Sequence, residues 1–170
     1  MTGGLAHFSL LLVDDNPTNL LLLAQIVEMD LSQVRVLTAR SAEEGLELAE
    51  EHEVDGAFVD VQMPLMSGLE MCRRLKENPR TNQIPVVLMT AHIATAELRA
   101  EGLDVGAYDF ISQPISNVEM LARIKVMLRL RQTEKKLLRT NEQLRQQVET
   151  KTSTLRWLSG LLLAGGDDVA

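Results

Sequence analysis

The sequence predicts an α/β fold in which five parallel strands form a sheet covered by helices on both faces. Short, wholly apolar runs alternate with amphipathic stretches over most of the chain. Strands buried on both faces read as continuous apolar runs, and strands that alternate with helices pair in parallel. Apolar residues make up 45% of the 170 residues but aromatic residues only 3%, so the core must be mainly aliphatic.

The five expected strands are short runs rich in Val, Leu and Ile that end at polar residues. The first ends at the pair Asp14-Asp15, the third at Asp60 and the fourth at Thr90. We place the strands at residues 8–13, 34–37, 56–60, 85–89 and 107–111.

Capping residues mark where the helices begin. Asn16-Pro17 predicts the first helix, because Asn caps a helix and Pro is tolerated at its first position. Ser41-Ala42-Glu43-Glu44 and Ser116-Asn117-Val118-Glu119 have the spacing of capping boxes, in which the serine and the glutamate satisfy each other's backbone N–H groups. We place the helices at residues 17–27, 42–49, 67–77 and 94–103, and from 117 onward.

Right-handed crossovers make a doubly wound sheet the expected topology, with the flavodoxin-like strand order 2-1-3-4-5. Ligands of such sheets bind beyond the carboxyl ends of the strands, where the winding reverses. Because strands one and three are neighbours in this order, Asp14, Asp15 and Asp60 should converge on one patch. Thr90 adds a hydroxyl group at the same rim.

Three carboxylates packed together raise each other's pKa or require a cation. An all-oxygen site of this kind suits Mg²⁺. A carboxylate can also act as a nucleophile and form an acyl phosphate. A single aspartate at a strand end would be adequately explained as a helix cap or turn former, but three aspartates and a threonine at strand ends favour a phosphoryl site.

The motifs around these residues resemble the receiver domain of two-component response regulators, of the chemotaxis (CheY-like) type, over residues 7–127. Their joint order and spacing are specific, although no single motif is decisive. The matching stretches are Leu12–Asn16, Val59–Pro64 followed by Ser67-Gly68, Leu88–Ala91, Gly102–Ala107 and Asp109–Ile111.

The resemblance implies a phosphoryl-transfer role for the acidic cluster. Asp60 would accept a phosphoryl group from a histidine kinase. Asp14 and Asp15 would hold Mg²⁺ together with Asp60, and the backbone carbonyl of Gln62 would also face the metal.

The resemblance also implies a switch. Thr90 would contact the phosphoryl group, and Phe110 would change rotamer as Thr90 moves.

One position departs from the family pattern, because Gln113 stands where a lysine usually precedes the proline after strand five. Glutamine carries no charge, so electrostatic assistance to transfer is reduced, and His92 is a candidate for compensating it. The family also leads us to expect a cis bond before Pro114.

The C-terminal helix carries a heptad pattern. From residue 127 a spacing of three and four residues holds for ten positions, seven of them apolar. This favours a coiled coil that forms a homodimer, with Asn141 at an a-type position where a buried amide fixes register. The alternative is a long helix that folds back on its own domain. The positions are Met127, Leu130, Glu134, Leu137, Asn141, Leu144, Val148, Lys151, Leu155 and Leu158.

We therefore expect three parts. These are a receiver domain over residues 1–122, a coiled-coil extension of its last helix over 123–159, and a segment over 160–170 that is a flexible tail or the start of a truncated output domain.

Charge divides the chain in a similar way. Residues 1–116 carry seven basic and eighteen acidic side chains, whereas residues 117–159 carry ten basic and four acidic ones. The basic charges are scattered without aromatic partners, which favours a solvated helix over a nucleic-acid surface.

A cytoplasmic location is expected. No apolar run approaches the roughly 18 residues of a membrane span, and the first residues lack the features of a signal peptide. The single cysteine, Cys72, suits a reducing compartment, and its spacing from Met71 and Leu75 indicates helix packing rather than reactivity.

Two functional readings remain open at this stage. The first is a switching module that relays phosphorylation through a dimerising helix to an effector. The second is a pseudo-receiver scaffold in which Gln113 has reduced or abolished phosphorylation. An independent enzyme, such as an aspartate-based phosphatase, fits poorly. That family has two aspartates separated by one residue after its first strand, whereas Asp14 and Asp15 are adjacent.

Overall fold

A computed structural model describes residues 8–92 and 94–164 of the chain. The chain divides into two compact units, residues 1–131 and residues 132–170. The first unit contains the sheet and all five helix starts. The second contains the rest of the last helix.

The sheet has five parallel strands in the order β2-β1-β3-β4-β5, which confirms the predicted doubly wound topology. In the register, Val13 lies between Ala39 on one side and Val59 on the other. This pairing brings the carboxyl ends of β1 and β3 side by side. The strands are β1 Phe8–Val13, β2 Val34–Ala39, β3 Gly56–Asp60, β4 Val86–Thr90 and β5 Asp109–Ser112.

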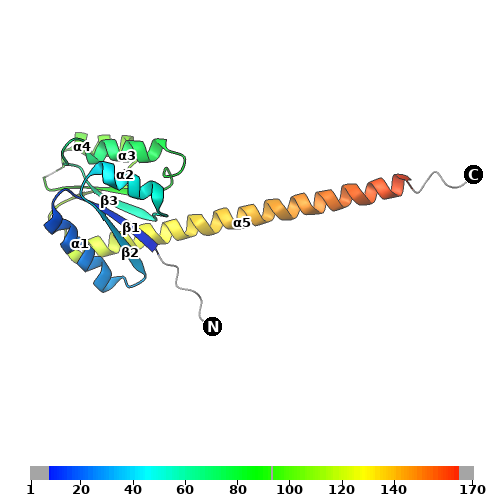
Figure 1. Ribbon diagram of the computed structural model, residues 1–170, viewed down its shortest axis with the longest axis horizontal. Coiled ribbons are helices and arrows are strands. Elements are labelled where there is room, and N and C mark those ends of the chain that lie inside the picture. Colours follow the sequence, from blue (N-terminus) through cyan, green and yellow to red (C-terminus); the bar gives the residue numbers. More distant parts are fainter. Residues whose placement is uncertain (1–7, 93, 165–170) are drawn as a thin grey trace, which may run out of the picture. The chain divides into compact units, whose positions relative to one another are not determined.

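Helices cover both faces of the sheet. In Figure 1, α1 and the beginning of α5 lie on one face, whereas α2, α3 and α4 lie on the other. Each face has its own apolar cluster, one built with Val27 and Ile124 and the other with Met71 and Leu75. The helices are α1 Pro17–Asp30, α2 Ala42–Glu51, α3 Gly68–Glu77, α4 Ala96–Asp104 and α5 Asn117–Ala164.

The predicted capping residues accept the expected N–H groups, but the glutamates of the two capping boxes find other partners, Glu119 pairing with Arg123. The Asn16 side chain accepts from the N–H of Thr18 at 2.9 Å, with Pro17 in the first helical position. The Ser41 hydroxyl accepts from the Glu44 N–H at 3.1 Å. The Glu44 carboxylate accepts from the N–H of Arg40 at 2.7 Å, one residue earlier than a regular capping box places it.

Two elements begin two residues later than predicted. The fourth helix begins at Ala96 rather than residue 94, because the Thr95 hydroxyl accepts from the Leu98 N–H and caps it there. The fifth strand begins at Asp109 rather than residue 107. Gly106 has a φ of 91°, and the Ala107 N–H bonds to the Gly102 carbonyl. Ala107 is therefore part of the turn that closes α4.

The first unit extends further along α5 than the predicted boundary at residue 122. The heptad pattern assigns Met127 to the interface of a dimer. In the structure it is fully buried in the apolar cluster of the first unit and packs against Gly56. Its inward direction reflects helical periodicity, because Met120, Ile124 and Met127 share one face of the helix. The heptad positions that are accessible to a partner therefore begin at Leu130, which is 47% exposed.

The C-terminal region follows the prediction in part. Residues 160–164 continue α5, beyond the expected end of the coiled coil at 159. The remainder of the expected tail, residues 165–170, lies outside the described residues. Within residues 8–92 and 94–164, no helix combines the length and the apolarity that crossing a membrane requires.

Candidate functional site at the carboxyl ends of the strands

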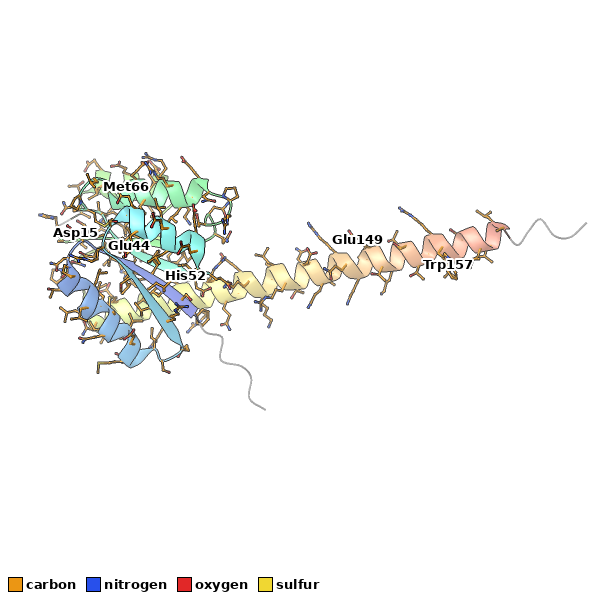
Figure 2. All side chains as sticks on the ribbon, viewed as in Figure 1. Asp15, Glu44, His52, Met66, Glu149 and Trp157 are labelled. Carbon is orange, nitrogen blue, oxygen red and sulfur yellow. The ribbon has the colours of Figure 1, made fainter. Side chains whose placement is uncertain are left out.

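Three aspartates meet at the rim of the sheet. Asp14 and Asp15 follow β1 directly, and Asp60 is the last residue of β3. Each offers a carboxylate oxygen, and these oxygens all lie within 4.8 Å of one another. Asp14 is buried, Asp60 half-buried and Asp15, labelled in Figure 2, exposed. The cluster thus extends from a buried carboxylate to one that is exposed to solvent.

Asp14 is held in place by the first turn of α1. One of its carboxylate oxygens accepts from the N–H of Asn16 at 2.8 Å, and the other accepts from the Asn19 side-chain amide at 3.0 Å. These bonds compensate for the burial of its charge. Asn19 was not singled out in the sequence, although its position one turn after the Asn16 cap could have suggested it.

The surroundings of Asp60 raise its proton affinity. One of its oxygens accepts from the Gln62 N–H at 3.1 Å. Its pKa is raised from 3.8 to about 6, chiefly by burial and also by the negative charges of Asp14 and Asp15, while hydrogen bonds from Gln62 and Val61 act in the opposite direction. Both the desolvation and the crowding of charge are costs that a bound cation would relieve.

Thr90 lies at the end of β4, the strand next to β3, and is buried. Its hydroxyl oxygen accepts from the His92 N–H at 3.3 Å, and its carbonyl accepts from the Gln113 N–H at 2.7 Å. Gln113 is therefore tied to the same rim and is half-buried. The bond between Gln113 and Pro114 is cis, as expected. His92 is exposed and reaches this rim through its backbone.

Phe110 is buried, with 6% of its surface exposed, in the apolar cluster between the sheet and α4. The guanidinium carbon of Arg99 lies 5.9 Å from the centre of the Phe110 ring, within the range of a cation–π contact. Arg99 also donates to the Ser112 hydroxyl at 3.1 Å. Sequence reasoning missed Arg99, since nothing local marks an exposed arginine on α4 as a partner of β5.

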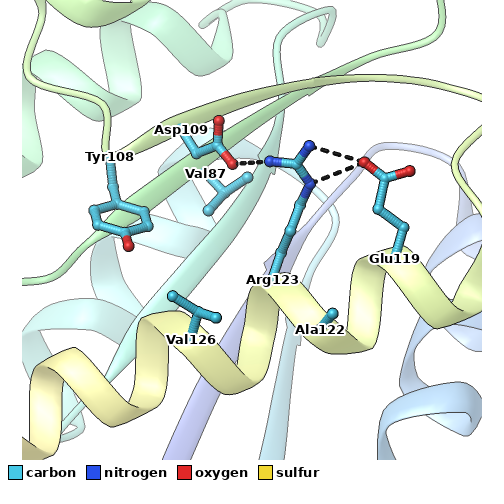
Figure 3. Close-up of a pocket in the computed structure, with 7 residues that line it drawn as sticks. All are labelled: Val87, Tyr108, Asp109, Glu119, Ala122, Arg123 and Val126. Carbon is cyan, nitrogen blue, oxygen red and sulfur yellow. Dashed lines mark hydrogen bonds and ion pairs between the residues drawn. The ribbon is translucent and has the colours of Figure 1, made fainter.

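A hollow away from the aspartates lies between β5 and α5 (Figure 3). It measures about 340 Å³ and is lined in part by Tyr108 and Val126. The charged side chains that line this hollow form ion pairs with one another, since Arg123 pairs with both Asp109 and Glu119. The hollow thus has no convergent charge left for a ligand, in contrast to the three aspartates at the rim.

Residues 10–125 match the family described as the response regulator receiver domain. The chain is 31% identical over 152 residues to a probable cyclic di-GMP phosphodiesterase of Vibrio cholerae, a match that covers 89% of this chain and 33% of that protein. It is 37% identical over 122 residues to the response regulator PleD of Caulobacter vibrioides, covering 72% of this chain and 26% of that protein. The chain thus spans a third or less of the length of these two relatives.

Solved structures agree on the fold. The crystal structure of a CheY-like response regulator receiver domain protein from Methanospirillum hungatei matches with a TM-score of 0.68 and 27% identity, over 75% of this chain and 98% of that one. The motifs at the rim, the strand order and the family match all point to one assignment, and the chain belongs to the response regulator receiver domain family.

Proposed function

We propose that the first unit accepts a phosphoryl group on Asp60 from a histidine kinase, with Mg²⁺ as its cofactor. The observation that supports this most directly is the meeting of three carboxylates within 4.8 Å at the ends of β1 and β3. These hard oxygen donors fit Mg²⁺, which takes a few carboxylates and keeps several waters. Asp14, Asp15, Asp60 and the backbone carbonyl of Gln62 would hold the ion.

In the proposed step, a carboxylate oxygen of Asp60 attacks the phosphorus of a phosphohistidine. The new O–P bond forms as the N–P bond breaks, and the electron pair of the broken bond returns to the imidazole nitrogen. With a pKa of about 6, Asp60 is mostly ionised at neutral pH and therefore nucleophilic. Bound Mg²⁺ would neutralise charge on the phosphoryl oxygens and the carboxylates.

Thr90 and Phe110 would convert the modification into a change of shape. Thr90 ends the strand beside the one that carries Asp60, and we infer that its hydroxyl would donate to a phosphoryl oxygen. Phe110 belongs to β5, the strand next to β4, and is part of the apolar cluster on one face of the sheet. A shift of Thr90 would alter the space available to the Phe110 ring. The position of this ring would in turn favour one of two arrangements of α4 and α5.

The downstream partner would be an effector that α5 reaches. The relative from Vibrio cholerae is named a probable cyclic di-GMP phosphodiesterase, and its match of 152 residues is longer than the 116-residue family match. We infer an effector domain or protein that receives the signal through this helix. We infer a cytoplasmic relay, which is supported by the free thiol of Cys72, since free thiols suit a reducing compartment.

Gln113 supports a second candidate function, that of a pseudo-receiver scaffold. Its N–H holds the rim through Thr90, but its side chain brings no positive charge to the phosphoryl oxygens. Loss of one preorganised charge of this type slows a transfer by roughly 100-fold or more in other enzymes. The acidic cluster is nevertheless complete, which favours slow phosphorylation over none.

Intact mass spectrometry after incubation with acetyl phosphate tests the proposal. We expect one phosphoryl adduct that requires Mg²⁺ and is absent from Asp60→Asn. Gln113→Lys should raise the rate of adduct formation by about tenfold or more, because it restores a cation at the rim. A folded chain that forms no adduct, and whose Gln113→Lys variant also forms none, would overturn phosphorylation and leave the scaffold function.

A further inference from the structure

The second unit presents an apolar stripe that no other described residue of that unit covers. From residue 132 the helix runs to Ala164, and all of its described residues except Lys135 are exposed. The stripe is large, because its aliphatic members are 44% to 81% exposed. Exposed aliphatic side chains repeated along one face of a helix are typical of a helix that packs against a partner. We call the stripe the seam and define it as Leu137, Leu144, Val148, Leu155, Leu158 and Leu162 with the polar members Glu134, Asn141 and Lys151.

We propose that the seam binds a second copy of this chain as a parallel, in-register coiled coil in which Asn141 faces Asn141 of the copy. This inference goes beyond phosphorylation and rests on different residues. The occupant is a helix of the same kind, because the seam keeps its spacing of three and four residues from residue 134 to residue 162.

Charge distribution around the helix agrees with a helical partner. The charged residues outside the seam lie, with one exception, on the outer face, and they are Lys135, Lys136, Arg139, Glu142, Glu149 and Arg156. Figure 2 labels Glu149 and Trp157, both of which lie outside the seam. The positions that flank the seam are mostly uncharged, Arg145 being the exception, and in a parallel pair Arg145 would face Thr140. No like charges therefore meet at the edges of such a pair.

The two charged seam residues, Glu134 and Lys151, favour an antiparallel pair. In a parallel pair Glu134 faces Glu134 and Lys151 faces Lys151. In an antiparallel pair centred between Asn141 and Leu144, Glu134 would face Lys151. Exposed ion pairs of this kind contribute little, less than the burial of one leucine side chain.

Burial decides the orientation. The antiparallel pairing places the second copy's Leu158 opposite Met127, which is already fully buried in the first unit. Leu158 and Leu162 would then have no seam to pack against, although they are 44% and 81% exposed. The parallel pairing buries both and lets the Asn141 amides bond to each other instead of facing Leu144. The gain in apolar burial exceeds the cost of the two like-charge layers.

Disulfide cross-linking of the full chain tests orientation and register together. Leu155→Cys lies on the seam, and in the parallel pair it faces itself within disulfide range. In the antiparallel pair it would face residue 130, and the two cysteines of the pair would be separated by about 25 residues of helix, on the order of 35 Å. Ser153→Cys, two residues away on the outer face, is the matched control. The wild type carries only the buried Cys72 and controls for that thiol.

Under mild oxidation we expect Leu155→Cys to form at least about ten times more disulfide-linked dimer than Ser153→Cys, as the geometric limits on a disulfide require. Sedimentation equilibrium of the wild type should give twice the chain mass of 18.9 kDa. A monomeric wild type would overturn the proposal, as would a dimer in which Leu155→Cys links no better than Ser153→Cys. Asp60→Asn should cross-link like the parent, which separates this result from a failure of phosphorylation.

Discussion

Gly68, the first residue of α3, packs directly against the backbone of Asp60. A Cβ atom at residue 68 would lie 2.2 Å from the Asp60 carbonyl oxygen and 2.9 Å from its carbonyl carbon. Both are backbone atoms that cannot swing aside as a side chain can. The N–H of Gly68 also donates to the Val61 carbonyl at 3.0 Å. The absence of a side chain at this glycine therefore sets how closely α3 approaches the strand end that carries the proposed phosphoacceptor.

Gly68→Ala should destabilise the fold by about 1–3 kcal/mol, the usual cost of forcing atoms into a packed site, and should slow formation of the Asp60 adduct. Gly160→Ala is the matched control, because nothing lies within 4 Å of its Cβ position. Alanine there should stabilise α5 by up to about 1 kcal/mol. Urea denaturation of both variants gives the comparison. Equal stabilities would show that the backbone at residue 60 is free to move.

Asp60→Asn should change stability in a pH-dependent way when metal is removed with a chelator. The folded-state pKa of Asp60, about 6, lies above its ordinary value of 3.8, so the folded protein binds the proton more tightly. The favourable contribution is full below pH 3.8 and is lost as the pH rises through about 6. At pH 8 the ionised carboxylate therefore costs stability that asparagine avoids.

Because Asp60 is half exposed, solvent screening reduces the expected gain at pH 8 to about 1 kcal/mol. The difference between Asp60→Asn and wild type, measured by urea denaturation from pH 4 to pH 8, isolates this residue from other carboxylates. A difference that does not grow with pH would contradict the raised pKa. Saturating Mg²⁺ should reverse the order at pH 8, since a cation stabilises the ionised wild type.

Met127→Ala should destabilise the first unit by about 2–5 kcal/mol, although it lies beyond the boundary that the sequence suggested. Its side chain is fully buried against Gly56 and the sheet. Val118→Ala, on the same helix and 79% exposed, should change stability by no more than about 0.5 kcal/mol. Thermal or urea unfolding distinguishes the two. If Met127→Ala instead only weakened dimerisation, Met127 would belong to the seam after all.

Cys72 should resist alkylation in the folded protein. Burial raises the pKa of its thiol to about 11, its side chain has no exposed surface, and the thiol lies 3.8 Å from the Val105 carbonyl. The thiolate is the reactive form, so both its scarcity and its burial protect it. Iodoacetamide at pH 8 should give no adduct within an hour-long incubation and one adduct in denaturant, as read by intact mass. Rapid modification of the native chain would show that α3 opens readily.

Local sequence was a good guide wherever an element carries its own start or stop signal. Asn16-Pro17 and Ser41 each marked the helix that follows, because a cap satisfies backbone groups only a few residues away. It was a weaker guide at Ala107, where the hydrogen bond to the Gly102 carbonyl assigns the residue to a turn rather than a strand.

The sequence by itself determined the alternation of strands and helices, and through it the strand order that brings Asp14, Asp15 and Asp60 to one rim. Periodicity and strand ends are local properties, and parallel crossovers leave few topologies open. Only the tertiary structure decided that Met127 faces the core rather than a partner, that Arg99 covers Phe110, and that Gly68 touches Asp60. These contacts join segments far apart in the chain, and an apolar stripe on a helix has the same spacing whether it packs against a sheet or against another helix.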